Sequence, residues 1–388
     1  MTDSTPSLGI DEIRPYHDAE VPAVLHRISH KASFFHLMRH LVPEFDRAAL
    51  LEALSGTRSV AEFQARMIHR AMRGILAETA SGLTVSGTEA LDAAAPRLFI
   101  ANHRDIILDS AILNVILHEL GLPTSRIAIG DNLMVSQLVT DLMRLNKSFI
   151  VHRTAPIHLM QAYAQRLSRY IRESICTDGQ SVWLAQRSGR TKDGRDETHT
   201  GLLKMLSLSG PSAHCESFAE LRLTPAVISY EYEPCDMLKA EELVHQAAQL
   251  PYTKDDKLSM IRGIRDPKGR IHLGIGGPVE LPPEPDAKAA SRNAWLRELA
   301  ARLDGEIRRQ YRLWPTHFAA WDLLHGSSRF AGRYTAEERA AFEAHVETRL
   351  LEVKGSRYLL RRQLLEIYAN SVDLCLPVQE GSPTAGDQ

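Results

Sequence analysis

His103 stands where an apolar run gives way to a polar segment, and it is the side chain of this sequence best placed for acid-base chemistry. It follows the run at residues 97–101, and two carboxylates, Asp105 and Asp109, come soon after it. A histidine at the end of a strand can take a proton from an attacking hydroxyl group when a carboxylate holds its tautomer. The first N–H groups of a following helix are free to stabilise an oxyanion. The segment predicts a general base, His103, with Asp109 or Asp105 as its partner.

Short apolar runs separated by helix-like segments occupy residues 83–282, which we interpret as one domain. The expected strands are residues 83–87, 97–101, 126–130, 148–152, 181–185 and 225–230, with a final strand pair around residues 270–281. Short apolar strands that alternate with helices are typical of a sheet covered on both faces. The fold class is therefore α/β, with a mixed, mostly parallel sheet, and ligands in such folds bind at the carboxyl ends of the strands.

Helical periodicity dominates both flanks of this domain. Residues 1–82 are expected to form a helical N-terminal segment, and residues 283–388 a helical C-terminal segment whose tail after Gln379 is frayed. In the second segment Leu296, Leu299 and Leu303 share one helical stripe, and Thr335 with Glu338 has the pattern of a capping box. If the protein acts on lipids, these flanks are expected to shape an acyl tunnel or to rest on the membrane.

Composition excludes several classes of function. The formal charge of the 388 residues is -2, which argues against bulk attraction to nucleic acid. Four cysteines far apart in the sequence indicate neither a disulfide framework nor a metal site, and His36 with His40 lacks a third ligand. The start of the chain does not have the pattern of a signal peptide, and no apolar window reaches the length of a spanning helix. We expect a cytoplasmic protein without a metal.

The segment around His103 resembles the first motif of the glycerol-3-phosphate and 1-acylglycerol-3-phosphate acyltransferase family, in which Asn-His is followed by Asp after a four-residue gap. Here Asn102 and His103 are followed by Asp109, with five residues between His103 and Asp109. The resemblance favours Asp109 as the partner of His103, with Asp105 as the cap of the following helix. Asp105 remains the alternative partner.

Two further segments resemble family motifs that bind the phosphate of the acyl acceptor. Residues 147–153 are similar to the second motif, which implies a phosphate contact for Arg153. Residues 186–194 resemble the third, which implies the same for Arg190, with Lys192 or Arg187 as alternatives, and a place in the site wall for Gly189. Gln186 stands where the family has a glutamate, so the resemblance implies a site wall there rather than an acid or base.

A strand that begins with proline closes the acyl side of the site in the family, and residues 224–230 are similar to it. The resemblance implies that Pro225 and Tyr230 line the site. The four similarities follow one another in the family's order, which makes the combination far more specific than any one of them. The segment at residues 103–105 also reads like a protein kinase loop, but the glycine-rich loop and strand lysine of a kinase are missing.

The resemblance implies transfer of a fatty acyl group from acyl-CoA or acyl carrier protein to a hydroxyl group of glycerol 3-phosphate or 1-acylglycerol 3-phosphate. An acyl thioester is already activated, so the reaction needs a base, oxyanion donors and cations for the acceptor phosphate, and no cofactor. Such an enzyme would work peripherally at the inner face of the membrane. The alternatives are a catalytically impaired lipid-binding relative and a thioesterase.

Overall fold

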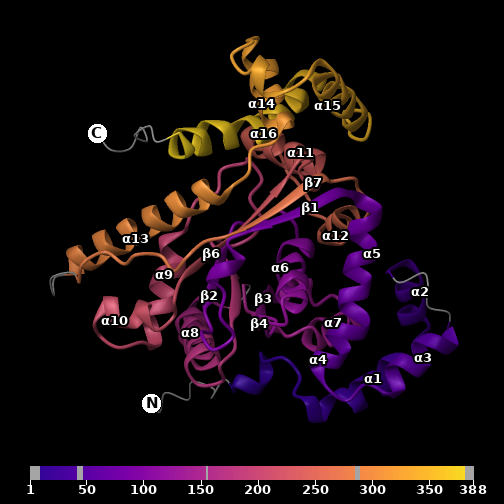
Figure 1. Ribbon diagram of the computed structural model, residues 1–388, viewed down its shortest axis with the longest axis vertical. Coiled ribbons are helices and arrows are strands. Elements are labelled where there is room, and N and C mark those ends of the chain that lie inside the picture. Colours follow the sequence, from indigo (N-terminus) through magenta and orange to yellow (C-terminus); the bar gives the residue numbers. More distant parts are fainter. Residues whose placement is uncertain (1–8, 42–46, 154–155, 285–288, 381–388) are drawn as a thin grey trace.

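A seven-stranded sheet forms the centre of the computed structural model, which describes residues 9–41, 47–153, 156–284 and 289–380. The strand order across the sheet is β1-β7-β6-β2-β5-β3-β4. The strands are β1 (Ala80–Ser86), β2 (Leu98–Ala101), β3 (Arg126–Gly130), β4 (Ser148–Val151), β5 (Val182–Ala185), β6 (Thr224–Tyr230) and β7 (Gly269–Ile275). Figure 1 shows helices around this sheet, with the C-terminal helices at the top of the view.

The directions of the strands bring several loops to one edge. β6, β2, β5, β3 and β4 are all parallel, whereas β7 is antiparallel to β6 and parallel to β1. The carboxyl ends of β2, β3, β4, β5 and β6 therefore meet the amino end of β7 at the same edge. The predicted fold class, a mixed, mostly parallel sheet with helical flanks, is confirmed.

Alternate residues of β2 contribute to two separate hydrophobic clusters, one on each face of the sheet. Phe99 and Ala101 pack with the first cluster, and Leu98 and Ile100 pack with the second. All four side chains are buried, which explains why the strand is apolar throughout. β2 is thus a central strand whose last residue leads directly into the segment of His103.

The first face is covered by N-terminal helices and by the helix that follows β2. These helices are α1 (Val21–Ser29), α2 (Ala32–Leu41), α3 (Arg47–Ser55), α4 (Val60–Phe63), α5 (His69–Thr79) and α6 (Leu108–Glu119), with a π-helical turn at Gln64–Ile68. α7 (Gln137–Leu145) adds Leu138 and Leu145 to the same cluster. In Figure 1 this group runs from α5 on the right down to α1 and α3.

The second face is covered by α8 (Met160–Cys176), α9 (Thr200–Leu206), α10 (His214–Ala219) and α13 (Ala289–Gln310). The stripe predicted for α13 is buried here, with Leu296, Leu299 and Leu303 packed in the cluster. Short 3₁₀ turns occur at Ile10–Glu12, Asp18–Glu20, Thr88–Ala90, Asp131–Leu133, Ile157–Leu159, Ser207–Ser209 and Ala331–Arg333.

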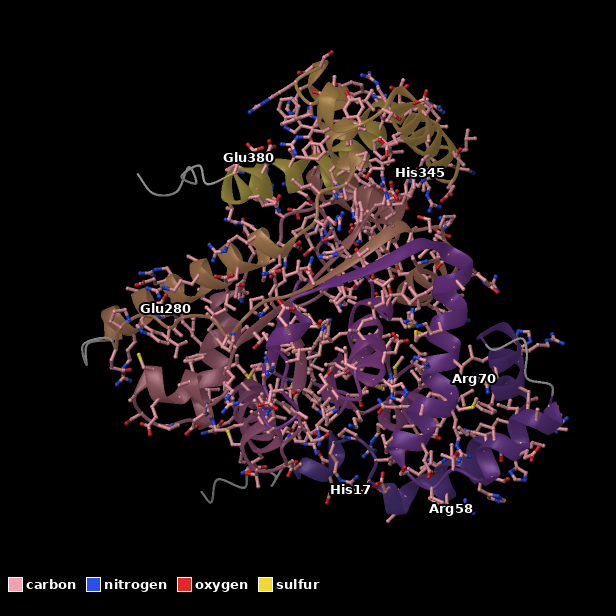
Figure 2. All side chains as sticks on the ribbon, in the orientation of Figure 1. His17, Arg58, Arg70, Glu280, His345 and Glu380 are labelled. Atoms are coloured by element: carbon pink, nitrogen blue, oxygen red, sulfur yellow. The ribbon has the colours of Figure 1, made fainter. Side chains whose placement is uncertain are left out.

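The C-terminal helices pack on α11 (Asp236–Ala247), which lies in the carboxyl-edge connection after β6. They are α14 (Pro315–His325), α15 (Ala336–Arg349) and α16 (Arg357–Gln379), and they share a hydrophobic cluster with α11. His345 of α15, labelled in Figure 2, is 2.7 Å from Asp236 of α11. The predicted capping box of Thr335 and Glu338 begins α15.

The prediction of a final strand pair is wrong. β7 is a single strand that ends at Ile275, and the chain then continues without a second strand through residues 276–284. Gly276, Gly277 and Pro278 follow β7 directly, and proline has no N–H to donate to a ladder. The segment keeps isolated backbone bonds to the start of β6, such as Val279 N–H to Leu223 O at 2.8 Å. The predicted frayed tail falls mostly outside the described residues.

Candidate active site

His103 lies in the loop between β2 and α6 and contacts the carboxylate of Asp109. Its Nδ1 is 2.9 Å from Oδ2 of Asp109, and its side chain is 12% exposed. The backbone N–H groups of Arg104 and Asp105 donate to the same Oδ2 at 2.6 and 2.9 Å. A carboxylate held in this way favours the tautomer with hydrogen on Nδ1 and leaves Nε2 able to accept a proton.

Tyr230 holds the other oxygen of this carboxylate. Its hydroxyl, at the carboxyl end of β6, donates to Oδ1 of Asp109 at 2.8 Å. Burial and the nearby Asp109 carboxylate raise the pKa of Tyr230 well above its usual value, so the phenol stays protonated. Both oxygens of the Asp109 carboxylate therefore have hydrogen-bond partners. Tyr230 contacts Asp109, the residue that holds His103, rather than His103 itself.

Asp105 has a different place from Asp109. Its Oδ1 accepts the N–H groups of Ile107 and Leu108 at 2.8 Å each, so it binds amides at the start of α6, whose N-cap residue is Ile107 and not Asp105. Burial, together with the charge of Asp109, raises the pKa of Asp105. Its Oδ2 lies against α12 (Asp256–Arg265), where a Cβ on Gly263 would come within 2.1 Å of it. The structure thus brings Asp109, not Asp105, to His103.

The expectation that the first amides of the helix are free for an oxyanion is wrong for Leu108. That N–H and the N–H of Ile107 donate to Asp105, and the N–H groups of Arg104 and Asp105 donate to Asp109. The loop is long enough for these bonds because α6 begins only at Leu108. The additional residue between His103 and Asp109 is accommodated in this loop.

Asn102 fixes the loop from the strand side, a role that the sequence did not predict. It is fully buried, and its side chain replaces a strand partner for Ile228 of β6. Ile228 N–H donates to Asn102 Oδ1 at 2.8 Å, and Asn102 Nδ2 donates to Ile228 O at 2.9 Å. Because this pairing extends the β2–β6 contact by one residue, the position of His103 is defined relative to both strands.

Arg104 lies at the centre of a buried ion-pair network that the sequence also did not predict. It is 1% exposed, and it contacts Asp196 at 2.6 Å and Glu233 at 3.2 Å. Lys239 of α11 contacts Glu233 at 2.5 Å and donates to the backbone oxygen of Arg104 at 2.8 Å. The residue after His103 is therefore held by the loop after β5, the loop after β6 and α11.

Arg190 approaches the site from the loop after β5. The N–H of its neighbour Thr191 donates to the backbone oxygen of His103 at 2.7 Å, which places this loop against the histidine. Arg190 is 7% exposed, and its Nη2 donates to Ser259 Oγ of α12 at 3.0 Å. Its Nη1 makes no hydrogen bond with any residue that the structure describes.

Arg153 follows β4 and lies beside the loop after β3. Its backbone N–H donates to Asp131 Oδ1 at 3.2 Å, and a Cβ on Gly130 would lie 2.8 Å from its Nε. Burial lowers the pKa of Arg153, although the charges of Asp131 and Asp256 act in the opposite direction. Arg190 also acts electrostatically on Asp256, the first residue of α12. The two predicted phosphate-binding arginines therefore lie around the same helix start.

The remaining predicted positions have more varied surroundings. Lys192 forms an ion pair with Glu242 of α11. Gln186 is fully buried, and its amide group makes no hydrogen bond among the described residues. Gly189 has φ of 77°, which favours glycine, and a Cβ there would meet nothing within 4 Å.

Pro225 is not brought to His103. It lies at the amino end of β6 and pairs with Ile100, whereas Tyr230 lies at the carboxyl end. Five strand residues span about 16 Å at the rise of a β-strand. The proposed wall position of Pro225 therefore falls toward the opposite edge of the sheet.

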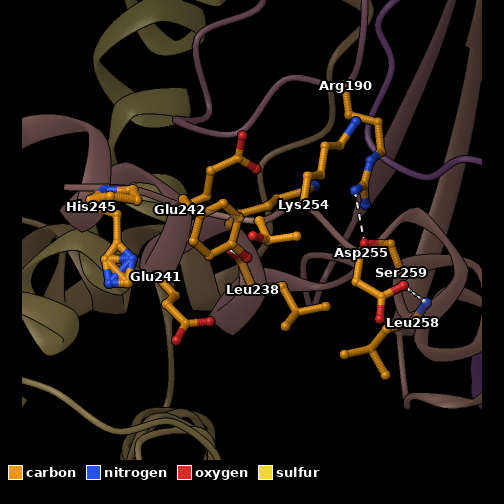
Figure 3. A pocket seen from close by; sticks show the side chains of 13 residues that line it. Arg190, Leu238, Glu241, Glu242, His245, Lys254, Asp255, Leu258 and Ser259 are labelled. Atoms are coloured by element: carbon orange, nitrogen blue, oxygen red, sulfur yellow. Dashed lines mark hydrogen bonds between the residues drawn. The ribbon is translucent and has the colours of Figure 1, made fainter. Parts of the chain in front are cut away.

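A cavity of about 280 Å³ opens beside Arg190 between α11 and α12. Its lining includes Arg190, Glu241, Glu242, His245, Tyr252 and Leu258, most of which are labelled in Figure 3, and does not include His103. In the part of the chain that the structure describes, no group of three or more His, Cys, Asp or Glu side chains is arranged to hold a metal ion. Nor does any described helix combine the length and apolar character needed to cross a membrane.

One family model matches part of this chain. Residues 82–212, which run from within β1 through β5 and include the loops of His103, Arg153 and Arg190, match the family model described as Acyltransferase. No curated protein matches the chain. Among solved structures, the 1-acyl-sn-glycerophosphate acyltransferase PlsC from Thermotoga maritima is similar, with 14% sequence identity and a TM-score of 0.38. That similarity covers 73% of this chain and 92% of the other.

Proposed function

We propose that this chain, whose residues 82–212 match an acyltransferase family model, moves a fatty acyl group from a thioester donor to a hydroxyl group of a phosphate-bearing glycerol acceptor. Acyl-CoA or acyl carrier protein is the donor, and 1-acylglycerol 3-phosphate or glycerol 3-phosphate is the acceptor. The observation that carries the proposal is the His103–Asp109 hydrogen bond of 2.9 Å at the edge of the sheet where Arg153 and Arg190 also lie.

The reaction is a direct attack without an acyl-enzyme. Nε2 of His103 takes the proton of the acceptor hydroxyl as its oxygen forms a bond to the thioester carbonyl carbon. The carbon–sulfur bond then breaks, and the departing thiolate receives the proton from the imidazolium. Asp109 stabilises the imidazolium and holds the ring, and Tyr230 holds Asp109 through Oδ1.

A transfer assay with defined substrates tests the proposed function and identifies the donor and the acceptor. The experiment crosses acyl-CoA and acyl carrier protein with glycerol 3-phosphate and 1-acylglycerol 3-phosphate, and mass spectrometry detects the new ester. We expect ester formation in at least one combination. Thiol release to water with no ester would indicate a thioesterase, and lipid binding with no thiol release would indicate an impaired relative.

Arg190 is proposed to bind the acceptor phosphate, because its loop is bonded to the backbone of His103 and its side chain lines the neighbouring cavity. Replacement of Arg190 by alanine is expected to raise the KM for the acceptor about 10- to 150-fold, because one or more charge-assisted hydrogen bonds to its phosphate are lost. The KM for the thioester should change little. Steady-state kinetics with each substrate varied separately measures both.

Arg195 offers the matched control for this variant. It lies in the same loop but is exposed, and it donates to Asn370 at 3.1 Å. Arg195→Ala should leave the acceptor KM within about twofold of the unaltered protein, as expected for an exposed contact. An unchanged acceptor KM in Arg190→Ala would exclude a phosphate contact at that position.

We also propose that the outer face of α12 rests on an anionic lipid surface. Leu258 and Ile261 are exposed on this face, between the exposed cations Lys257 and Arg265, and Leu250 just before the helix is 56% exposed. The inner face of the same helix contacts Arg190 and Asp105. Exposed apolar side chains among cations are suited to an anionic interface, and this helix would place it next to the phosphate site.

A double variant tests this surface. Leu250→Gln with Ile261→Gln is expected to lower sedimentation of the protein with vesicles that contain anionic phospholipid by about tenfold, since each side chain loses its burial in the interface. Transfer to the soluble acceptor glycerol 3-phosphate should remain. Leu120→Gln with Leu208→Gln, two exposed leucines after α6 and α9, is the control that should still sediment. Equal sedimentation of both double variants would contradict the assignment.

A further inference from the structure

The cavity beside Arg190 has room for more than a phosphate group. Its volume of about 280 Å³ is close to the lower end of small-molecule sites, which hold about 300 Å³ or more. Arg190 lines it, and the loop of Arg190 is bonded to the backbone of His103 on the other side. A phosphate held by Arg190 would therefore lie between the reacting hydroxyl group and this cavity. 1-Acylglycerol 3-phosphate ends at its phosphate and would leave the cavity unfilled.

Glu241 is the carboxylate of the cavity lining that makes neither a hydrogen bond nor an ion pair with a described residue. Among the described residues it makes no ion pair, although it lines the cavity from α11. The neighbouring carboxylates are already engaged, because Glu242 pairs with Lys192 and Asp255 accepts the N–H of Leu258 at 2.8 Å. Figure 3 shows Glu241 on the opposite side of the cavity from Arg190. Arg190 thus lies at one end of the cavity, beside the hydrogen-bonded Asp255, and the unpaired carboxylate of Glu241 lies at the other.

Tyr252 and His245 complete the end near Glu241. Their rings are 5.4 Å apart between centroids, and both line the cavity. Burial, with the charges of Glu241 and Glu242, raises the pKa of Tyr252 to about 12, so its ring remains a neutral phenol. Neutral aromatic faces attract ammonium groups, and a nearby carboxylate adds to this attraction.

The cations in the lining do not neutralise Glu241. Lys239 contacts Glu233 and the backbone of Arg104, and Lys254 contacts Asp256 at 2.8 Å. Among the described residues, Arg190 is therefore the lining cation without an ion pair, and Glu241 the lining carboxylate with neither an ion pair nor a hydrogen bond. This arrangement matches a zwitterionic acceptor whose negative group is near the reacting hydroxyl and whose positive group lies further from that hydroxyl.

From these contacts we propose that the cavity binds a cationic headgroup esterified to the acceptor phosphate, so that the preferred acceptor is a lysophospholipid with an amine in its headgroup. The inference rests on the proposed acyl transfer and names its acceptor class. Arg190 binds the phosphate, and Glu241 with Tyr252 binds the ammonium group.

The test compares two acceptors of equal acyl chain, 1-acylglycerophosphoethanolamine and 1-acylglycerol 3-phosphate, in the same transfer assay. The unaltered protein is expected to have the higher kcat/KM with the ethanolamine acceptor. Glu241→Gln should lower that kcat/KM about tenfold through loss of the ionic contact, and should change kcat/KM for 1-acylglycerol 3-phosphate by no more than about twofold. Glu216→Gln, at an exposed position of α10, is the control and should change neither.

The outcomes separate this inference from the proposed function. Transfer to 1-acylglycerol 3-phosphate with no preference for the ethanolamine acceptor, or an equal effect of Glu241→Gln on both acceptors, would overturn the headgroup site alone. Absence of transfer to either acceptor, and to glycerol 3-phosphate, would overturn the proposed function and this inference with it. Thermal unfolding of Glu241→Gln is measured alongside, and an unchanged Tm shows that a kinetic effect is local.

Discussion

Replacement of His103 by alanine is expected to slow acyl transfer about 10²- to 10⁴-fold, the contribution of a positioned general base. The methyl side chain cannot take the proton of the acceptor hydroxyl, while Arg153 and Arg190 still have their contacts with the loops after β3 and with α12. The loss should therefore fall on kcat, with the acceptor KM nearly unchanged. Initial rates of ester formation over a range of acceptor concentrations measure both constants.

The stability of this variant should be close to that of the unaltered protein. His103 is partly exposed, and its side-chain hydrogen bond is the one to Asp109, which keeps the N–H donors of the loop and the hydroxyl of Tyr230. His325→Ala, at an exposed position of α14, is the control for loss of an imidazole and should retain full activity. A His103→Ala protein that keeps more than about a tenth of the activity would be incompatible with a general base at this position.

The second large effect concerns stability. Arg104→Met is expected to lower the free energy of unfolding by about 3–5 kcal/mol, since removing one partner of a buried ion pair leaves charge uncompensated. Methionine preserves much of the apolar length of the side chain, so the decrease in the free energy of unfolding comes mainly from removal of the charge. Asp196 would lose its ionic partner, and Glu233 would keep Lys239. Unfolding in urea, followed by circular dichroism, gives the free energy difference.

An exposed arginine provides the comparison for this measurement. Arg169 of α8 is 55% exposed and lies 3.7 Å from Glu173, four residues further along the helix. Arg169→Met should change the free energy of unfolding by less than about 1 kcal/mol, as for other exposed ion pairs. Similar losses in the two variants would show that the Arg104 network does not stabilise the fold more than a surface pair does.

The parts of the fold that the sequence predicts are those set by local pattern. Apolar runs of four or five residues gave β2, β3, β4 and β5 within one residue of their observed ends, because a strand buried on both faces must be apolar throughout. Asp109 and Asp105 were the two candidate partners of His103 because all three lie within one strand–loop–helix segment, and the family resemblance favoured Asp109. The strand pair predicted around residues 270–281 shows what local pattern cannot predict. Glycines and a proline after an apolar run are typical of a turn between two strands, but here they follow the last strand of the sheet.

The contacts that hold the loop of His103 in place could not be predicted, because the residues that make them come from distant parts of the chain. Arg104 meets Asp196 and Glu233 across sequence separations of 92 and 129 residues. Tyr230 reaches Asp109 across 121 residues, and only the strand order β6-β2 brings them together. A polar residue that is buried in a pairing of this kind has no periodic signal, so the structural roles of Asn102 and Arg104 could not be predicted.

A single-turnover experiment with a limiting amount of labelled acyl thioester is the clearest test of transfer from thioester to acceptor without an acyl-enzyme. Samples with and without the acceptor are quenched at successive times, and both the ester product and the mass of the intact protein are measured. The account predicts that thiol release and ester formation occur together, require the acceptor and leave the mass of the protein unchanged. Thiol release without acceptor, with the acyl group passing to water or remaining on the protein, would contradict it.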